Sequence, residues 1–433
     1  MNATLSRQLV IVAAASAVLS FAGPARAQSA PTCSFAGGVL SVTVNGNAAT
    51  LSVVGGNIRL NNVNCTGATT SSTDSIQING GALADKVTLT GTFAPGATPD
   101  LDGGSEIEIG FALAGASDTL TVKETTGADL VTFTAGGIDV GNDGDEDITT
   151  AGVEVVKLLG LDGDDDLDAA LYAGGGKLYL YGGNGSDGII GSAAADWLYG
   201  EAGDDTIAGG DGNDQITDGT GIDLLYGDGG NDKFKQQAAT DMTGGDADDI
   251  HGGAGTDTVD YSLRTERVWV TLNDTVGDGA WDGAANLYEN DNAASDLENI
   301  IGGAGNDYLA GTDVTNTLTG GAGEDTLVGW GGVDILKGGT GYDHIWGGYG
   351  NDKIYGEGDQ DELHGEEGND TLWGGASNDA MYGEAGKDTY YGEDGNDLIY
   401  NNDGIAETVD CGPGASDDVE PSAGDSFIAC EIF

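Results

Sequence analysis

The 433-residue chain has few basic residues: 14 lysines and arginines stand against 73 aspartates and glutamates, for a formal net charge of −59. Proline is scarce as well (6), and aromatic residues make up only 7% of the chain. The shortage of lysine and arginine excludes nucleic-acid binding and docking onto anionic lipid, since both need clustered positive charge. The 79 glycines do not recur at every third position, which excludes collagen. Because a compact chain of this charge repels itself, two interpretations remain: a disordered acidic polymer, or a fold that takes up cations.

Long apolar runs are almost absent too, and the exception lies at the N-terminus. Residues 1–27 are interpreted as a secretory signal peptide, with Arg7 in a positive start, an apolar run over residues 9–21 and a small-x-small cleavage pattern at residues 25–27. That run is too short to span a bilayer, and no later stretch is long enough to be transmembrane. We therefore expect a soluble, secreted mature protein, extracellular or at the cell surface, with the periplasm as a further location.

Cysteine is limited to four residues, Cys33, Cys65, Cys411 and Cys430. An even number in an exported chain predicts disulfides. Four cysteines allow three connectivities, and we favour the one with two local pairings, Cys33–Cys65 and Cys411–Cys430. Zinc is the weaker alternative, because the CxxC spacing is missing and the chain has only three histidines.

Much of the second half of the chain is a repeat. From Gly302 to Tyr400 the sequence divides into eleven contiguous units of nine residues without an insertion. The first position is glycine in every unit, the sixth is aspartate in all but one, where Asn316 stands, and the eighth is apolar throughout. A disordered acidic linker would show no such phase relation, so the pattern indicates a repeat architecture.

An earlier array has the same phase. Six contiguous units run from Gly182 to Lys235, a degenerate unit around Asp165 precedes them, and two units around Asp248 and Asp257 follow a short break. Residues 261–301 contain no nonapeptide.

The order of residue types in the unit suits a hard cation. Glycines at positions one, two and four tolerate positive φ, so a turn can aim its backbone carbonyls at one point. The aspartate at position six adds a carboxylate there, and calcium prefers about six to eight oxygen ligands. The triplet at positions seven to nine predicts a very short strand whose central apolar residue points inward.

These units resemble the repeats-in-toxin (RTX), or haemolysin-type, calcium-binding nonapeptide GGxGxDxUx of bacterial secreted proteins. The resemblance covers residues 160–260 and 302–400, with a full match at residues 182–189, whereas the unit at residues 191–199 keeps its aspartate and leucine but loses most glycines. It implies an all-β fold, a parallel β-roll or β-helix solenoid in which two nonapeptides make one turn. It also implies several calcium ions, each shared between turns of successive coils.

The candidate calcium ligands are the sixth-position aspartates and the glycines at positions one and four of the better-preserved units. They are Asp165, Gly182, Gly185, Asp187, Asp196, Gly200, Gly203, Asp205, Gly209, Gly212, Asp214, Asp223, Gly227, Asp232, Asp248, Gly252, Gly255, Asp257, Gly302, Gly305, Asp307, Gly320, Gly323, Asp325, Asp334, Gly338, Gly341, Asp343, Gly347, Gly350, Asp352, Asp361, Gly368, Asp370, Asp379, Asp388, Gly395 and Asp397.

Outside the arrays the sequence predicts further β structure. Residues 28–159 alternate short apolar strands with turns and are interpreted as an irregular β-solenoid-like N-terminal domain, with an all-β sandwich as the alternative. The arrays then occupy residues 160–260 and 302–400, and residues 261–301 form a non-repeat β insertion between them. Residues 401–433 are expected to form a disulfide-closed cap, because a solenoid end exposes an unpaired edge.

No catalytic pattern accompanies the repeats. The HExxH and GxSxG motifs are absent, and the histidines, His251, His344 and His364, lie in repeat units at varying positions. We therefore interpret the protein as non-catalytic.

Aromatic side chains gather at the ninth position late in the second array. They are Trp346, Tyr355, His364, Trp373, Tyr382, Tyr391 and Tyr400. Since alternate units fall on opposite sheets of a roll, two outward columns are expected, which either stabilise exposed strands or bind a ligand.

Two functions follow. The first is a calcium-dependent structural or cell-surface protein whose folding is driven by Ca²⁺. The alternative is a calcium-dependent adhesin or glycan-binding module that uses the aromatic columns. Its partner would be a surface glycan or another extracellular protein.

Overall fold

A computed structural model describes residues 155–173, 177–237, 247–280, 291–401, 403–413, 417–420 and 424–430, together with the backbone of the strands between Thr32 and Thr149. The predicted signal peptide, residues 1–27, and the side chains of Cys33 and Cys65 lie outside this description. Every regular element in the described residues is a β-strand. Among them no helix has the length and apolarity needed to cross a membrane.

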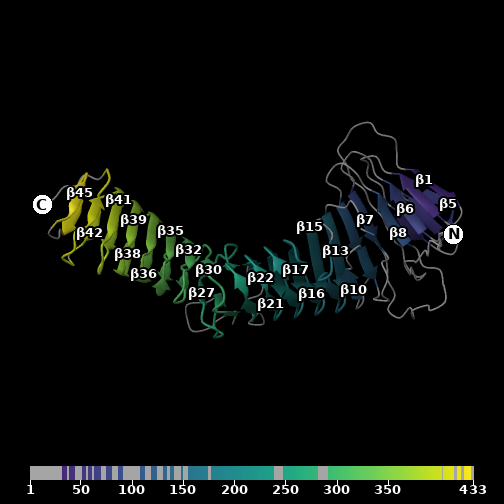
Figure 1. Ribbon diagram of the computed structural model, residues 1–433, viewed down its shortest axis with the longest axis horizontal. Helices are drawn as coiled ribbons and strands as arrows, with labels where there is room; N and C mark the ends of the chain where they lie inside the picture. Colours follow the sequence, from purple (N-terminus) through teal and green to yellow (C-terminus); the bar gives the residue numbers. More distant parts are fainter. Residues whose placement is uncertain are drawn as a thin grey trace. The chain divides into compact units, whose positions relative to one another are not determined.

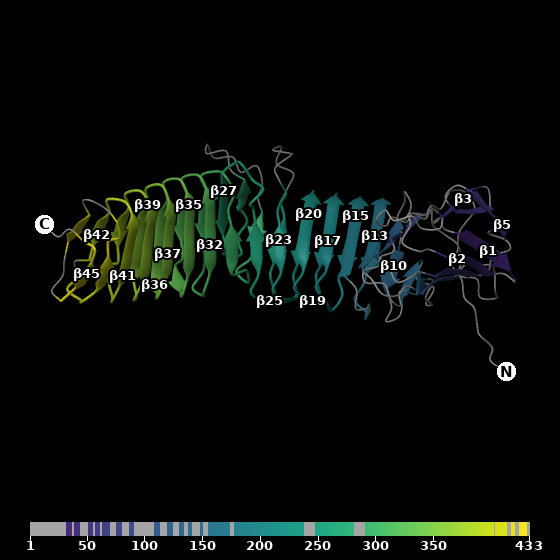
Figure 2. The same cartoon turned by 90° about the horizontal axis from the view of Figure 1, so that it is seen from above.

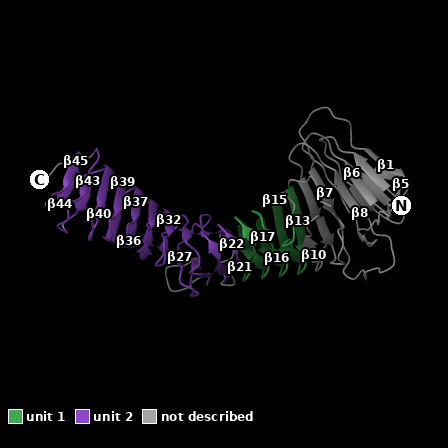
Figure 3. Cartoon of the chain, viewed as in Figure 1, with its two compact units in different colours: residues 1–223 green, residues 224–433 purple. Residues whose placement is uncertain are grey.

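The chain divides into two compact units, residues 1–223 and residues 224–433 (Figure 3). Unit 1 begins with short strands of mixed direction. They are β1 (Thr32–Ala36), β2 (Val39–Thr43), β3 (Leu51–Val54), β4 (Asn57–Leu60), β5 (Val63–Thr69), β6 (Ser75–Asn79), β7 (Lys86–Thr90), β8 (Glu108–Ala112), β9 (Thr119–Lys123), β10 (Leu130–Phe133), β11 (Gly137–Val140) and β12 (Ile148–Thr149).

These N-terminal strands form an irregular solenoid. The parallel ladders β2–β6–β8–β12 and β7–β9 follow the solenoid pattern, while β1–β2, β3–β4–β5 and β10–β11–β12 pair antiparallel. Parallel pairing between strands distant in sequence favours the predicted irregular solenoid over an antiparallel sandwich.

The rest of unit 1 is regular. One parallel ladder joins β13 (Val155–Asp162), β15 (Lys177–Asn184), β17 (Trp197–Ala202) and β20 (Gln215–Thr220). A second joins β14 (Asp166–Asp168), β16 (Gly188–Ile190) and β18 (Thr206–Ala208), and β19 (Asp211–Gly212) lies at a turn.

Unit 2 is built from two long parallel ladders. The first joins β30 (Asn299–Ile301), β32 (Thr317–Ala322), β35 (Ile335–Thr340), β37 (Lys353–Gly358), β39 (Thr371–Ala376), β41 (Thr389–Asp394), β43 (Thr408–Asp410) and β45 (Ser426–Ile428). The second joins β27 (Val268–Thr271), β31 (Tyr308–Ala310), β33 (Thr326–Val328), β36 (His344–Gly350), β38 (Glu362–Glu367), β40 (Ala380–Tyr382), β42 (Leu398–Tyr400) and β44 (Asp418–Glu420). Figures 1 and 2 show the strands of each ladder side by side along unit 2.

The start of unit 2 contains the remaining, shorter strands. They are β21 (Leu224–Tyr226), β22 (Gly229–Gly230), β23 (Lys233–Lys235), β24 (Asp249–His251), β25 (Ala254–Gly255), β26 (Thr258–Asp260), β28 (Gly279–Ala280), β29 (Asn292–Ala293) and β34 (Gly331–Gly332). Two of these strands join the insertion to the ladders: β24 pairs with β29 and β26 pairs with β30, both in parallel.

Strand register confirms the period of the solenoid. Leu336 pairs with Ile354, and Ile354 with Leu372, so equivalent residues lie 18 positions, or two nonapeptides, apart. The eighth-position side chains from Leu309 to Ile399 are all fully buried and form the core. Burying such an apolar side chain contributes roughly 1.5–3 kcal/mol, so the core is the main stabilising element of each coil.

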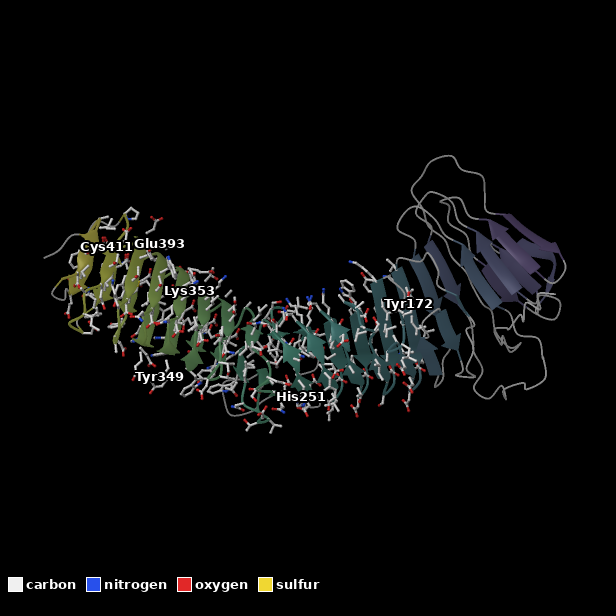
Figure 4. The ribbon with its side chains drawn as sticks, viewed as in Figure 1. Tyr172, His251, Tyr349, Lys353, Glu393 and Cys411 are labelled. Carbon is white, nitrogen blue, oxygen red and sulfur yellow. A yellow bond between two sulfur atoms is a disulfide. The ribbon has the colours of Figure 1, made fainter. Side chains whose placement is uncertain are left out.

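The predicted Cys411–Cys430 disulfide is present and closes the C-terminal cap. Cys411 is fully buried, and Figure 4 labels it close to Glu393 at the C-terminal end of unit 2.

Candidate metal centre

The turns before each strand depend on backbone conformations that favour glycine. Gly339 and Gly341, at positions two and four of their unit, have φ of +119° and +120°. A Cβ atom at Gly341 would overlap the carbonyl oxygen of Gly323, one coil earlier. Both requirements favour glycine at these two positions.

The first-position glycine has a different role from the predicted one. None of the first-position glycines from Gly302 to Gly392 has positive φ, so the sequence-based reason was wrong for this position. A Cβ atom on Gly347 would instead lie 2.7 Å from Asp352 Oδ2 and 2.7 Å from the carbonyl oxygen of Gly365. The glycine is therefore needed because a carboxylate and a carbonyl of the next coil both approach its Cα atom.

A ladder of hydrogen bonds links the sixth positions of successive coils. The backbone N–H of twelve sixth-position residues donates to Oδ1 of the aspartate 18 residues later, over 2.7 to 3.0 Å. The donors are Asp187, Asp196, Asp205, Asp307, Asn316, Asp325, Asp334, Asp343, Asp352, Asp361, Asp370 and Asp379. We call each sixth-position side chain, together with the turn around it, a rung.

At most rungs the other carboxylate oxygen, Oδ2, is buried and accepts no hydrogen bond. We call these rungs open; their residues are Asp187, Asp205, Asp257, Asp325, Asp334, Asp343, Asp352, Asp361, Asp370, Asp379, Asp388 and Asp397. Asp165, Asp214, Asp223, Asp232 and Asp248 occupy equally buried sixth positions. A buried, ionised oxygen without a donor is costly unless a cation neutralises it.

Among the described rungs we call three closed, because a protein donor binds the oxygen that is left free at an open rung; at Asp196 it is Oδ1 instead that is buried and accepts no hydrogen bond. The Ser192 N–H and hydroxyl donate to Asp196 Oδ2 over 2.7 and 2.8 Å, and the Gly303 N–H donates to Asp307 Oδ2 over 2.7 Å. In the third, the Thr312 N–H donates to Asn316 Oδ1 over 2.7 Å.

The backbone at position two separates the two kinds of rung. At each open rung this residue has left-handed φ, whether it is a glycine such as Gly339 or another residue such as Glu366, at +71°. At the closed rungs Ser192, Gly303 and Thr312 do not. We infer that left-handed φ turns the N–H away from the carboxylate and leaves Oδ2 for a cation.

The open rungs fit calcium. Their donor set consists of carboxylate and backbone carbonyl oxygens, which are the ligands calcium prefers. Among the described residues, no group of three or more His, Cys, Asp or Glu side chains lies close enough to hold a metal ion. Carboxylates alone therefore do not complete a site, and backbone carbonyls, such as that of Gly365 beside Asp352, would supply further oxygens.

The electrostatics favour a positive charge beside these carboxylates. Burial raises the pKa of Asp343, Asp361 and Asp370 to about 8, against backbone hydrogen bonds that lower it. Burial likewise raises the pKa of Asp334 to about 7, and even that of Asp307, whose two oxygens accept backbone N–H groups, to about 7. The ionised form is thus disfavoured at these positions unless a cation lies beside it.

The fourth-position candidates lie farther along the turn. A Cβ atom on Gly350 would overlap the carbonyl oxygen of Gly332 and lie 3.1 Å from Asp352 Oδ1, the ladder acceptor. These glycines therefore permit close stacking of turns, while the first-position glycines adjoin Oδ2.

Sequence reasoning missed five carboxylates that continue the ladder. Asp291 and Glu298 accept the N–H groups of Asp248 and Asp257, 3.1 and 2.7 Å away, in the insertion. In the cap, Asp417 and Asp425 accept from Asp397 and Glu407, and Glu407 itself takes the sixth position of its coil. Four of these acids, all but Asp425, stand two residues before a buried apolar residue in the sequence, but no full set of glycines in phase accompanies them.

Comparison with protein-family models finds the RTX calcium-binding nonapeptide repeat. It matches residues 181–216, 208–234, 242–261, 301–336, 310–344, 331–363 and 364–399. A search of the curated proteins found no match.

Proposed function

Because this chain carries RTX calcium-binding nonapeptide repeats across residues 181–399, we propose that it is a secreted, non-catalytic β-roll protein whose folding is driven by Ca²⁺. It would serve as a structural component outside the cell or at the cell surface. The observation that carries this proposal is the succession of open rungs, in which donor-free carboxylate oxygens are buried in consecutive coils.

Calcium would act on folding through charge. In unit 2 the carboxylates of Asp343, Asp352 and Asp361 are buried in adjoining turns, and nearby acids raise the pKa of Asp343 and Asp361 further. Without a cation the ionised chain repels itself there, and with one the same oxygens become ligands. An ion that binds only the folded chain stabilises it by mass action.

A calcium titration of the mature chain, followed by far-ultraviolet circular dichroism, tests the proposal. Chelated protein should have little β structure and should gain it cooperatively as calcium is added. Magnesium serves as the control, because it demands near-ideal octahedral geometry and keeps its water. A chelated sample whose spectrum and melting temperature match those of the calcium-loaded protein would overturn the proposal.

The surroundings of the histidines support a non-catalytic role. His344 and His364 both contact Glu362, over 3.1 and 3.3 Å, and His251 contacts Asp249 over 3.3 Å. All three lie beside acids on outward strand positions, and His364 is also stacked between Trp346 and Tyr382.

An adhesin role has one observation in its favour. Trp330 and Tyr349 are 55% and 66% exposed, and Figure 4 shows Tyr349 projecting from unit 2. The ninth-position columns suit ligand stacking less well, since Tyr355 stacks on Trp373 with ring centroids 4.4 Å apart and Trp373 stacks on Tyr391. Their ring faces therefore cover one another. A glycan array with calcium present and absent, repeated with Trp330→Ala, would test this role; binding that is lost in the variant would support it.

A further inference from the structure

The C-terminal cap contains a rung that differs from those of the nonapeptides. Thr408 and Val409 pair in register with Thr389 and Tyr390, so Glu407 takes the place that Asp388 has one coil earlier. The Glu407 N–H donates to Asp425 Oδ1 over 3.1 Å, which continues the ladder, and the residue is only 2% exposed. A glutamate thus stands at a buried position where every complete repeat has aspartate or asparagine.

The carboxylate of Glu407 is buried among other oxygens. The Asp388 N–H lies within hydrogen-bonding reach of it, as at the rungs of the repeats, and so does the hydroxyl of Tyr390. The Asp388 carboxyl is in reach as well, and Asp403 and Asp425 add further negative charge. Two buried acids and a hydroxyl therefore converge on one place in the cap.

A tyrosine hydroxyl completes the cluster. At other rungs, the first-position glycine adjoins Oδ2 and the carbonyl oxygen of the next coil; Gly374, for example, adjoins Asp379 Oδ2 and the Gly392 oxygen. At Gly383 a Cβ atom would meet Asp388 Oδ2 and the hydroxyl of Tyr390 instead. Tyr390 is fully buried; its hydroxyl lies 3.5 Å from the Tyr400 carbonyl and within hydrogen-bonding reach of the Gly383 N–H and of the Glu407 carboxylate, so its oxygen lies beside both acids.

We propose that Asp388, Glu407 and the hydroxyl oxygen of Tyr390 form a calcium site in the C-terminal cap, with a ligand set unlike that of the nonapeptide rungs. It rests on the proposed function only in taking calcium as the ion. The donor set is oxygen alone, which favours a hard cation over zinc or copper. Because Asp388 belongs to the last repeats and Glu407 to the cap, the ion would join the two, alongside the Cys411–Cys430 disulfide.

A shared proton is the competing explanation. Two buried carboxyl groups can form one hydrogen bond if one of them is protonated, and such a pair needs no metal. The two explanations differ in the number of calcium ions bound by the full mature chain, which native mass spectrometry counts directly.

The test compares wild type with Glu407→Gln and with a matched control, Glu420→Gln. Glu420 is an exposed glutamate of β44 in the same cap. With calcium in excess, Glu407→Gln should bind one ion fewer than wild type, and Glu420→Gln should bind the same number. Circular dichroism checks that both variants fold.

The outcomes separate this proposal from the function it rests on. If wild type binds several ions and Glu407→Gln binds the same number, the proposal of a calcium site in the cap is wrong and the shared-proton explanation is favoured. If wild type binds no calcium, the proposed function falls as well. Should Glu407→Gln fail to fold, Tyr390→Phe decides, since it removes only an oxygen: the last ion should bind about tenfold more weakly, and an unchanged loading curve would overturn the proposal.

Discussion

Two neighbouring stretches of unit 2 have the same repeat, but their sixth-position side chains differ in whether they accept a backbone hydrogen bond from their own turn. The rungs at Asp307 and Asn316 are closed by backbone N–H groups, whereas those from Asp325 to Asp397 leave Oδ2 without a donor. Both stretches have glycine at position one and the same 18-residue ladder. The difference lies in the φ of one residue per unit, at position two. A nonapeptide that fits the sequence pattern can therefore either leave a carboxylate oxygen for an ion or supply that oxygen with a backbone donor.

The neighbouring coil explains the closed rung at Asp307. Gly303 is followed by Ala304, whose N–H donates to the carbonyl of Arg264 in the insertion over 2.9 Å. A Cβ atom on Gly303 would lie 2.5 Å from that same carbonyl. The turn at Gly303 thus packs on a non-repeat segment, while Gly321, one coil later, packs on another repeat turn and has φ of +115°.

Acidification of chelated protein should produce the largest effect, because protons reach all open rungs at once. Burial raises the pKa of Asp343, Asp361 and Asp370 from 3.8 to about 8, so the folded chain holds protons that the unfolded chain has released between these values. Stability of the calcium-free fold is therefore highest below about pH 4 and falls as pH rises towards 8. Circular dichroism of chelated protein across this range should show β structure returning as pH falls.

Calcium affinity should change in the opposite sense, since protons compete for the same oxygens. The calcium midpoint should rise as pH is lowered from 8 to 5. If chelated protein gains no β structure at low pH, then repulsion between ionised carboxylates does not cause the calcium-free chain to unfold.

Paired substitutions at one open and one closed rung test the comparison directly. Asp352→Asn keeps an oxygen to accept the Asp334 N–H but removes the charge at an open rung, so the calcium midpoint of folding should rise several-fold. Asp307→Asn leaves one of the two backbone donors, Val268 or Gly303, without an acceptor, so it should destabilise the fold at every calcium concentration but raise the midpoint less than Asp352→Asn. The measurement is a calcium titration of each full-length variant. Equal shifts would show that open and closed rungs do not differ in ion binding.

Removal of an aromatic ring should cost stability even in saturating calcium, without changing the number of ions bound. Trp373 lies between Tyr355 and Tyr391 in a column on the strand surface, with centroid separations of 4.4 and 5.4 Å. Aromatic pairs contribute about 0.5–1.5 kcal/mol beyond their area, so Trp373→Ala should lose roughly 1–3 kcal/mol. Thermal melts in saturating calcium would measure this, with Tyr349→Ala as the exposed control. A variant that melts like wild type would indicate that the column serves a ligand instead.

The sequence predicted the core and the period, but neither the hydrogen-bond ladder nor the state of each rung. The phase of leucine and aspartate is sufficient to place Leu336 in the core and Asp334 at a turn beside its equivalents in neighbouring coils, because both follow from the period alone. Position two is different: Gly303 is a glycine yet closes its rung, and Glu366 is not a glycine yet opens its own. That conformation depends on the coil against which the turn packs, which a nine-residue pattern does not contain. Glu407 was missed for a related reason, since no glycines in phase accompany it.

The smallest expected effect concerns the strain at position two of an open rung. Glu366 is exposed and has φ of +71°, a conformation that costs a residue with a Cβ atom about 1–2 kcal/mol and glycine very little. Because glycine also loses more entropy on folding, Glu366→Gly should stabilise the calcium-loaded protein by about 0.5–1 kcal/mol. Glu366→Gln removes the same charge but keeps the Cβ atom, so it isolates the backbone contribution and should melt close to wild type. The number of ions should be unchanged in both variants, since Asp370 Oδ2 remains without a donor. If Glu366→Gly lost an ion, or melted below Glu366→Gln, left-handed φ at this position would not be what keeps the rung open.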